Sequence, residues 1–412
     1  KHCEENIMKD IGPIFRSLLR NKLGVILIAL QIALTLAIVT NAAFIIRERS
    51  ADIARPSGLD EENTAMFITN LFDSNVDQRQ LYRDDLEAIR AIPGVLAAAP
   101  TQSMPVSGSG WGEDLYTDPE MPSNESINFG KFMVDEHGLD AFGLELVAGR
   151  MFTPDEMVTR SFEEMEVARV LVISQALADN LFPDGDALGK TVWDEPNGQQ
   201  PMEIIGIYDH MQNAWPTSRN VNNTALTPEI SMFGGQMMYV VRAEPGQLDQ
   251  VMQATEAYLS KNRSRIVEIV RSYPEQKSRT YSRDIAMVKL LSGVIIVLTG
   301  VTGLGIIGLA WFSVTQRRKQ IGTRRALGAT RADIVRYFMV ENWLITSAGL
   351  AVGLIGTVGL NWFLDTQYEV GRVPLWYLPV GMMALWILGQ LAVLLPARRA
   401  ANIPPALATR SV

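Results

Sequence analysis

Four long apolar segments constrain this chain more than any other feature of its sequence. Residues 23–46, 290–315, 342–364 and 373–397 each lack a charged side chain and consist mostly of aliphatic residues. A helix needs about 20 apolar residues to cross the hydrocarbon core of a membrane, and all four segments exceed that length. Helices buried in soluble proteins are rarely so long and apolar on every face. The sequence therefore predicts an α-helical membrane protein with four transmembrane helices.

The region between the first two apolar segments, residues 47–284, has a different character. It alternates short runs rich in Val, Ile and Leu with Pro, Gly, Asn and Asp. Residues 168–182 are typical of a strand followed by a helix, and residues 201–210 and 236–245 of strands bounded by turns. Residues 105–114 predict an exposed loop. We expect a large mixed α/β domain with its own core, inserted between transmembrane helices 1 and 2.

Charge is distributed unevenly and predicts an orientation. Residues 47–284 contain 20 Lys and Arg and 38 Asp and Glu, a net charge of −18, whereas the rest of the chain has a net charge of +10. Lys and Arg near the membrane mark the cytoplasmic side. The 316–341 loop carries seven of them, whereas the 365–372 loop has only Arg372. We expect a bacterial inner-membrane protein with both termini cytoplasmic and residues 47–284 periplasmic.

The net charge, the single cysteine and the N-terminal segment argue against several other classes of protein. A net charge of −8 argues against nucleic acid as a partner. The single cysteine, Cys3, leaves no internal disulfide. Residues 1–22 form a cytoplasmic segment, in which residues 11–21 mix apolar and basic side chains as an interfacial helix does. Residues 23–46 exceed the roughly 7–15 apolar residues of a signal peptide, which favours a retained anchor.

The sequence contains no complete motif for catalysis, for a metal or for a cofactor. The segment from Gly185 to Thr191 has three residues between its glycines where a phosphate-binding loop needs four. Neither C-x-x-C nor H-E-x-x-H occurs. Ionisable residues within spans usually mark an ion path, but Glu341 and Asp365 lie at span edges, where we expect them to reach water. We therefore predict no catalytic residue, no metal and no cofactor bound by this chain.

The loop from 316 to 341 carries the most information about function. Ile321, Ala326 and Leu327 are apolar side chains among basic ones, and the spacing predicts a short surface helix over about 317–328. Gly328 would end it. Thr330, with Asp333 three residues later, is typical of a capping box that opens the next helix. The loop either shows an apolar patch to a partner or only fixes the topology, and its residues alone leave both alternatives open.

Glycines punctuate the second and third apolar segments. Gly300 and Gly303 lie in the second, and Gly349 and Gly353 form a G-x-x-x-G motif in the third. Small residues let helix backbones approach closely in lipid, so these spans should pack against other helices as well as against the lipid bilayer. Four helices are few for an enclosed pathway, and we therefore expect a dimer.

Several stretches resemble a known family. Residues 320–329, QIGTRRALGA, resemble the E-I-G-x-[RK]-[RK]-A-[LI]-G-A segment of FtsX-like and MacB-like ABC transporter permeases, and residues 396–405 are similar to their P-A-x-x-A-A-x-I-x-P ending. Residues 142–152 resemble the G-x-x-x-x-x-G-R-x-F segment of the MacB-like periplasmic core. Further similar stretches follow in the same order, at 172–174, 181–182, 188–190 and 204–207. The resemblance covers nearly the whole chain.

The resemblance implies a role in transport. It implies a MacB-like periplasmic core domain over 47–284 and an FtsX-like permease domain over 285–412. Such permeases work as homodimers or heterodimers with a cytoplasmic ABC ATPase, expected here as a separate chain that holds ATP and Mg. They serve export, efflux or lipoprotein handling, in some cases with a periplasmic adaptor and an outer-membrane channel. The residues implied in the ATPase-coupling helix are Gln320, Ile321, Gly322, Arg324, Arg325, Ala326, Leu327 and Gly328.

Three departures from the family pattern bear on this reading. Gln320 stands where Glu is usual, Thr323 where an aliphatic residue is common, and Leu407 where an acidic residue is frequent. These departures fit two explanations: the chain is one half of a heterodimer whose other subunit keeps the usual residues, or the sequence has drifted. Two other classes of function stay open: a permease-like sensory protein that signals to a kinase, and a membrane-anchored enzyme with its site in residues 47–284.

Overall fold

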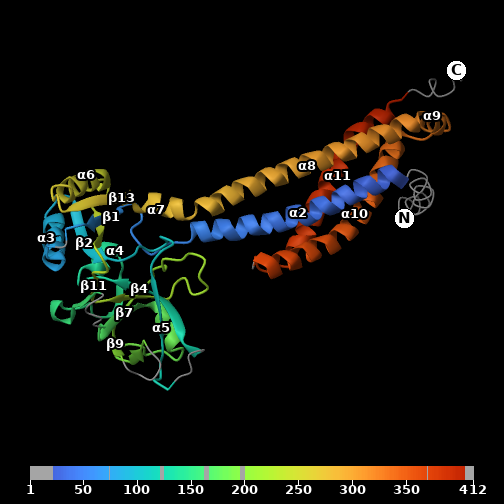
Figure 1. Ribbon diagram of the computed structural model, residues 1–412. Helices are drawn as coiled ribbons and strands as arrows, with labels where there is room; N and C mark the ends of the chain where they lie inside the picture. The colour runs from blue at the N-terminus through green and yellow to red at the C-terminus, as the bar shows by residue number, and fades with distance from the viewer. Residues whose placement is uncertain are drawn as a thin grey trace. The chain divides into compact units, whose positions relative to one another are not determined.

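The chain folds into two compact units (Figure 1). The computed structural model describes residues 22–73, 75–120, 125–161, 167–194, 200–368 and 370–403. The inserted unit comprises Ala54–Arg283, and the helical unit comprises the described residues before and after it. The predicted interfacial helix at 11–21, Leu407 and the last two residues of the 396–405 motif lie outside the described residues.

The helical unit contains four long helices. They are α2 (Lys22–Ala54), α8 (Ser282–Gln316), α10 (Arg331–Tyr368) and α11 (Tyr377–Ala401). Each is long and apolar enough to cross a membrane, so the four predicted spans are confirmed. The fourth helix begins at Tyr377, four residues later than predicted. Gly371 has a φ of +85°, and Pro374 has no N–H to donate, so the chain turns before the helix starts.

Polar side chains join the helices inside this unit. The hydroxyls of Thr35 in α2 and Thr302 in α8 lie 2.7 Å apart and are buried. Asn41 in α2 donates to the backbone carbonyl of Thr357 in α10 at 3.2 Å. Hydrogen bonds of this kind hold neighbouring helices together where the surroundings are as apolar as the helices themselves. They fix the register of α2 against two of its neighbours.

The inserted unit contains two larger sheets. The first is antiparallel, with the order β13–β1–β12–β2. Its strands are β1 (Thr64–Leu71), β2 (Val95–Thr101), β12 (Gln236–Ala243) and β13 (Arg265–Ser272), and α3 (Gln78–Arg90) and α6 (Leu248–Leu259) pack on it. Successive side chains of a strand point to opposite faces. Phe67 therefore joins one buried cluster and Met66 another.

The second sheet is mixed, with the order β3–β4–β10–β7–β9–β5 and with β8 paired to β9. Its strands are β3 (Trp111–Leu115), β4 (Ile127–Met133), β5 (Leu146–Gly149), β7 (Val170–Ser174), β8 (Thr191–Trp193), β9 (Pro201–Tyr208) and β10 (Thr224–Thr227). The remaining elements of the unit are α4 (Gly138–Phe142), a 3₁₀ helix (Pro154–Glu156), β6 (Val158–Arg160), α5 (Gln175–Leu181), β11 (Glu229–Ser231) and α7 (Tyr273–Thr280).

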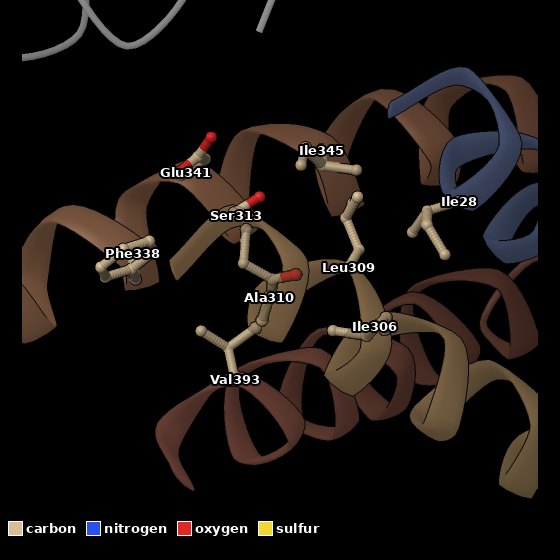
Figure 2. Close-up of a pocket in the computed structure, with 10 residues that line it drawn as sticks. Ile28, Ile306, Leu309, Ala310, Ser313, Phe338, Glu341, Ile345 and Val393 are labelled. Carbon is tan, nitrogen blue, oxygen red and sulfur yellow. The ribbon is translucent and has the colours of Figure 1, made fainter. Parts of the chain in front are cut away.

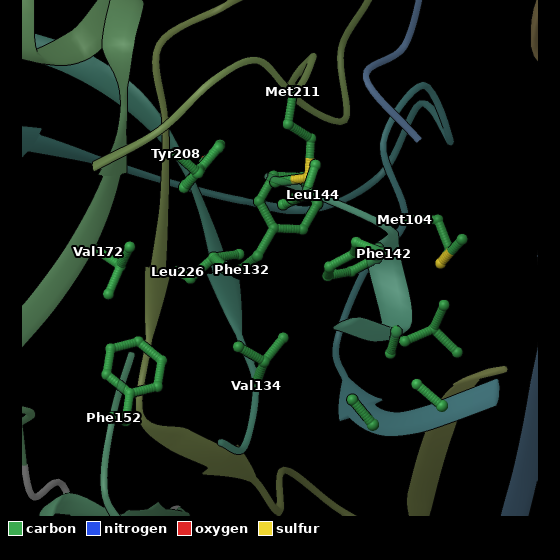
Figure 3. Close-up of a cluster of buried hydrophobic side chains, with 14 of the residues drawn as sticks. Met104, Phe132, Val134, Phe142, Leu144, Phe152, Val172, Tyr208, Met211 and Leu226 are labelled. Carbon is green, nitrogen blue, oxygen red and sulfur yellow. The ribbon is translucent and has the colours of Figure 1, made fainter. Parts of the chain in front are cut away.

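One hydrophobic cluster joins the two sheets (Figure 3). It packs Met66 and Val240 of the first sheet with Phe132, Val172 and Leu226 of the second. Each fully buried side chain of this size contributes about 1.5–3 kcal/mol. The two sheets therefore form a single folded body, and the predicted mixed α/β domain after the first span is confirmed.

The predicted segments of this unit are mostly confirmed, with one correction. The strand and helix expected in 168–182 are β7 and α5, and 201–210 and 236–245 contain β9 and β12. The predicted exposed loop at 105–114 is confirmed only in its middle, where Gly108 and Ser109 are exposed and belong to no helix or strand. Pro105 and Val106 are buried, and Trp111 begins β3. The loop folds inward because the Val106 N–H donates to the carbonyl of Asn213 at 3.0 Å, which fastens it to a neighbouring segment.

The G-R-x-F stretch has a structural role. Gly149 has a φ of +79°, and a Cβ there would lie 2.2 Å from the carbonyl oxygen of Ile205, so no larger residue fits. The Arg150 guanidinium contacts both carboxylate oxygens of Glu156, at 2.6 and 2.8 Å. Its hydrogen bonds lower the pKa of Glu156 to about 2. These contacts fix the turn between β5 and the 3₁₀ helix.

A polar cluster ties the first residues of the inserted unit to its last helix. Lys277 of α7 donates to both carboxylate oxygens of Glu61 at 2.8 and 3.1 Å, and to the carbonyl of Arg55 at 3.2 Å. Ser57 donates its hydroxyl to Glu61 at 2.8 Å. The chain therefore enters and leaves this unit at one place, held by an ion pair.

Acid should weaken this ion pair. Burial raises the pKa of Glu61. Hydrogen bonds from Lys277 and Ser57 lower this pKa by more than burial raises it, so it lies below the ordinary value of 4.5. A carboxyl whose folded-state pKa is lowered stabilises the fold above its unfolded pKa and loses that effect as pH falls through the folded pKa. We expect Glu61→Gln to lower the thermal midpoint of the full chain at pH 7, and the deficit to shrink as pH falls below 4.5.

Thermal unfolding in detergent across this pH range measures the effect. The matched control is Glu275→Gln, which removes a more exposed ion pair with Arg279 in the same helix. Exposed ion pairs contribute little to stability, so the thermal midpoint of the control should stay near that of wild type at pH 7 and at pH 3. A Glu61→Gln deficit that stays constant from pH 7 down to pH 3 would exclude the ion pair as its source.

Candidate functional site

A short basic helix lies between α8 and α10 at one end of the helical unit (Figure 1). This helix, α9, spans Arg318–Ala326, within the predicted range. Gly328 follows it with a φ of +102°. The Gly328 N–H donates to the Arg325 carbonyl at 3.2 Å, and the Ala329 N–H donates to the Arg324 carbonyl at 3.0 Å. This pair of bonds is a Schellman motif, and it stops α9 at the predicted glycine.

The start of α10 is fixed by the predicted capping box. The Asp333 carboxylate accepts from the Thr330 N–H at 2.8 Å and from its hydroxyl at 2.6 Å. The Asp333 N–H donates to the Thr330 hydroxyl at 3.2 Å. These reciprocal bonds satisfy donors that a helix start otherwise leaves free. Four residues, from Leu327 to Thr330, thus turn the chain sharply from one helix into the next.

An ion pair joins the start of α9 to α10. Arg317, the N-cap of α9, donates to both carboxylate oxygens of Glu341 at 3.0 Å, and to the Tyr337 hydroxyl at 2.9 Å. The side chains of Arg317 and Glu341 are 15% and 7% exposed. A two-pronged pair between guanidinium and carboxylate fixes direction as well as distance. It holds α9 to α10 as one body.

The expectation that Glu341 reaches water is wrong. Glu341 is buried, because α8 and α10 lie close enough for Arg317 to cover it. The sequence carried a signal for this pair: Arg317 lies two residues after the second apolar segment, and Glu341 immediately precedes the third. Ionisable residues at such places usually pair with one another.

Tyr337 contacts both ends of α9. The Arg324 guanidinium lies 4.9 Å from the centre of its ring, and that of Arg317 lies 5.8 Å from it. Cations are attracted to aromatic faces at such distances. Phe338 packs edge-on against Tyr337 at 5.5 Å and belongs to the buried core. These contacts join α9 to an aromatic pair of α10.

The predicted coupling residues divide into two faces. Ile321 and Gly322 are buried against the bundle, where Ile321 shares a cluster with Ile334 and Phe338. Leu327 is 83% exposed. The other exposed members of the predicted set are Gln320, Arg324, Ala326 and Gly328, and Arg325 is half-buried. Ile321 is thus an anchor to the bundle, and the apolar surface open to a partner consists of Ala326 and Leu327.

The four glycines predicted to pack against other helices also fall into two groups. A Cβ at Gly349 would lie 2.8 Å from the Ala29 carbonyl oxygen, and a Cβ at Gly353 would lie 2.9 Å from the Ala33 Cα. This motif brings the backbones of α10 and α2 together. Gly300 and Gly303 bring no backbones together in this way among the described residues. A Cβ at Gly300 would meet nothing within 4 Å, and at Gly303 the nearest atom belongs to Leu388 at 3.8 Å.

A small cavity lies inside the bundle beside the ion pair (Figure 2). Its volume is about 20 Å³, and Glu341, Ser313 and Asn342 supply its polar lining. A water molecule needs roughly 10–15 Å³ of such space. The Asn342 amide nitrogen is buried with no hydrogen-bond partner among the described residues. The cavity therefore suits one bound water and is far too small for a transported molecule.

Fold and site together define a multi-pass membrane protein with a large α/β domain after its first helix. The family model for the MacB-like periplasmic core domain matches residues 23–258, and that for the FtsX-like permease C-terminal domain matches residues 292–405. The chain belongs to this family, the ABC transporter permeases of the MacB and FtsX type.

Three named proteins are similar to this chain in sequence. The macrolide export ATP-binding/permease protein MacB of Neisseria meningitidis is 28% identical over 68% of this chain. The uncharacterized ABC transporter permease YvrN of Bacillus subtilis is 26% identical over 67% of this chain and 69% of its own length, and YknZ of the same organism is 26% identical over 79% of this chain and 78% of its own. The match spans 43% of the Neisseria protein.

Proposed function

We propose that this chain is the non-catalytic permease subunit of an ABC transporter, with α9 as the helix that docks on a separate cytoplasmic ATPase. The observation that carries the proposal is the construction of α9. It is locked to α10 by Arg317 and Glu341, yet presents Leu327 and Ala326 to a partner. A charged loop that only fixed the topology would need neither the lock nor the exposed apolar side chains.

The proposed orientation follows from the basic residues. Seven Lys and Arg between residues 316 and 341 support a cytoplasmic position for α9 and, with it, for both termini. The inserted unit then lies in the periplasm. ATP and Mg would bind the partner ATPase, and a second permease subunit would complete the dimer. The open face of Gly300 is available for that second subunit.

The proposed mechanism transmits motion rather than conducting substrate. ATP binding and hydrolysis would move α9, and the Arg317–Glu341 pair and Tyr337 would pass the movement to α10. The contacts of Gly349 and Gly353 would pass it on to α2, which leads into the inserted unit. That unit would act on the substrate, in export, efflux or lipoprotein handling, with an adaptor and an outer-membrane channel as further partners. The name of the Neisseria relative supports an export role.

A detergent pull-down from the native membrane tests the proposal. The tagged wild-type chain should retain an ABC ATPase, and the double variant Ala326→Glu/Leu327→Glu should lose at least nine-tenths of it. Both positions are exposed, so the variant should keep wild-type thermal stability. The charged side chains would face an apolar contact and leave it unpaired.

The control is Gln367→Glu, which adds a charge at an exposed position at the other end of α10. It should retain the ATPase fully. Equal ATPase recovery with the double variant would reject α9 as the docking helix. Recovery of a kinase in place of an ATPase would favour the sensory alternative.

A further inference from the structure

A second feature at the α9 end of the bundle is a groove between α10 and α11 that coupling does not use. Its volume is about 570 Å³, within the usual size range of ligand sites. We call it the basic groove and define it by Arg331, Val335, Arg336 and Met339 of α10 and by Arg398 and Ala401 of α11. None of the described residues that line it is acidic.

Two of the three arginines that line the basic groove are open to a ligand. Arg331 and Arg398 are exposed and form no hydrogen bond or ion pair within the described ranges of the chain. The neighbouring acidic side chain, Asp333, is occupied by the Thr330 cap. Arg399 differs from its neighbour Arg398, since its guanidinium lies 5.2 Å from the ring centre of Trp311 in α8. Unpaired guanidinium groups are suited to phosphate.

The apolar lining and the position of the groove specify the kind of phosphate. Val335, Met339 and Ala401 add apolar side chains to a lining that also holds the arginines. Met339 lies within one turn of the third apolar segment, and Arg398 directly follows the fourth. The groove therefore adjoins the ends of two spans, where lipid headgroups meet hydrocarbon. Basic pockets between helices on the cytoplasmic side are places where anionic headgroups bind.

We propose that the basic groove binds the headgroup of an anionic phospholipid. Arg331 and Arg398 hold its phosphate, while Val335 and Met339 contact the first carbons of its acyl chains. The proposal rests on the orientation proposed above, which puts this end of the bundle in the cytoplasmic leaflet. A lipid seated between α10 and α11 would wedge their ends at a fixed separation and so tune the movement that α10 receives.

Native mass spectrometry of the full chain tests this site. The chain is mixed in detergent with equal amounts of phosphatidylglycerol and phosphatidylcholine that carry the same acyl chains. Wild type should retain phosphatidylglycerol preferentially, and Arg331→Gln/Arg398→Gln should lower that preference about tenfold or more, since each basic residue near a membrane surface adds roughly 1 kcal/mol. Arg331→Lys/Arg398→Lys should keep most of it, which separates lost charge from misfolding.

Two further arms identify the ligand. Arg399→Gln removes a charge from the same turn of α11 but outside the groove, and should leave the preference unchanged. An excess of glycerol 1-phosphate should not displace the lipid. Displacement by glycerol 1-phosphate would reduce the groove to a simple anion site and overturn the proposal. Equal retention of both lipids by wild type would also overturn it. So would an unchanged lipid preference in Arg331→Gln/Arg398→Gln.

The lipid and the ATPase give separate readouts. If Arg331→Gln/Arg398→Gln loses ATPase capture but keeps its lipid preference, the groove belongs to the ATPase interface and the lipid proposal is overturned. If Ala326→Glu/Leu327→Glu keeps the ATPase while the lipid preference depends on Arg331 and Arg398, the coupling proposal is wrong and the lipid site stands.

Discussion

Replacing Glu341 by Gln should detach α9 from α10 and abolish coupling. The substitution keeps the shape of the side chain but leaves Arg317 buried beside a neutral amide. Removing one partner of a buried ion pair costs about 3–5 kcal/mol, because the remaining charge is left uncompensated. We expect a clear fall of the thermal midpoint in detergent. We also expect that a captured ATPase, still bound through Leu327, is no longer stimulated by this chain.

The matched control is Asp365→Asn at the other end of α10. Asp365 lies 3.4 Å from Arg372, and their side chains are 26% and 89% exposed. Exposed pairs are worth about 0–1 kcal/mol, so this variant should behave as wild type. The exchanged pair Arg317→Glu/Glu341→Arg should recover part of the loss. If Glu341→Gln keeps full stimulation and stability, Glu341 plays no part in coupling.

Replacing Gly353 by Val should separate α10 from α2. A Cβ at this position would lie 2.9 Å from the Ala33 Cα and 3.0 Å from the Ala33 carbonyl oxygen, and both belong to backbone that cannot give way cheaply. Overpacking of this kind costs about 1–3 kcal/mol or more, and the two further carbons of Val add to it. We expect lower thermal stability and a break in the route from α10 to α2.

Gly359→Val is the control for this prediction. It introduces the same side chain into the same helix, at a position where a Cβ meets nothing within 4 Å. The thermal midpoints of the two variants measure the difference directly. Equal midpoints would mean that the approach of α10 to α2 does not depend on the absence of a side chain at Gly353.

Local signals in the sequence predict local structure correctly. Gly328 and the Thr330–Asp333 pair fix the end of α9 and the start of α10, because capping depends on residues three or four apart. The four spans follow from length and apolar character alone. The existence of the four spans, the end of α9 and the start of α10 can therefore be predicted without knowledge of the rest of the fold. The limits of the long helices cannot, since α8 and α10 begin well before their apolar segments and α11 begins four residues late.

Contacts between distant elements could not be predicted in the same way. Arg317 and Glu341 lie beside two apolar segments, which marks both as candidates for pairing, but the packing of α8 and α10 around one cavity decides that they meet each other. Gly300 and Gly353 look alike in sequence, yet in the part of the chain that the structure describes only Gly353 lies against another helix. Ile321 and Leu327 are both apolar residues of one basic segment, and the packing of α9 decides which is buried. Tertiary packing thus sets which predicted residues form the site.

Cross-linking at Leu327 tests the central claim most directly. Cys3 is the only cysteine, so a Cys3→Ser background carries a single thiol at Leu327→Cys, or at Gln367→Cys as the control. With a short thiol-to-amine cross-linker in native membranes, we predict an adduct between Leu327→Cys and an ABC ATPase, and none from Gln367→Cys. An ATPase that is recovered with the chain but joins at Gln367→Cys and not at Leu327→Cys would contradict α9 as the coupling helix.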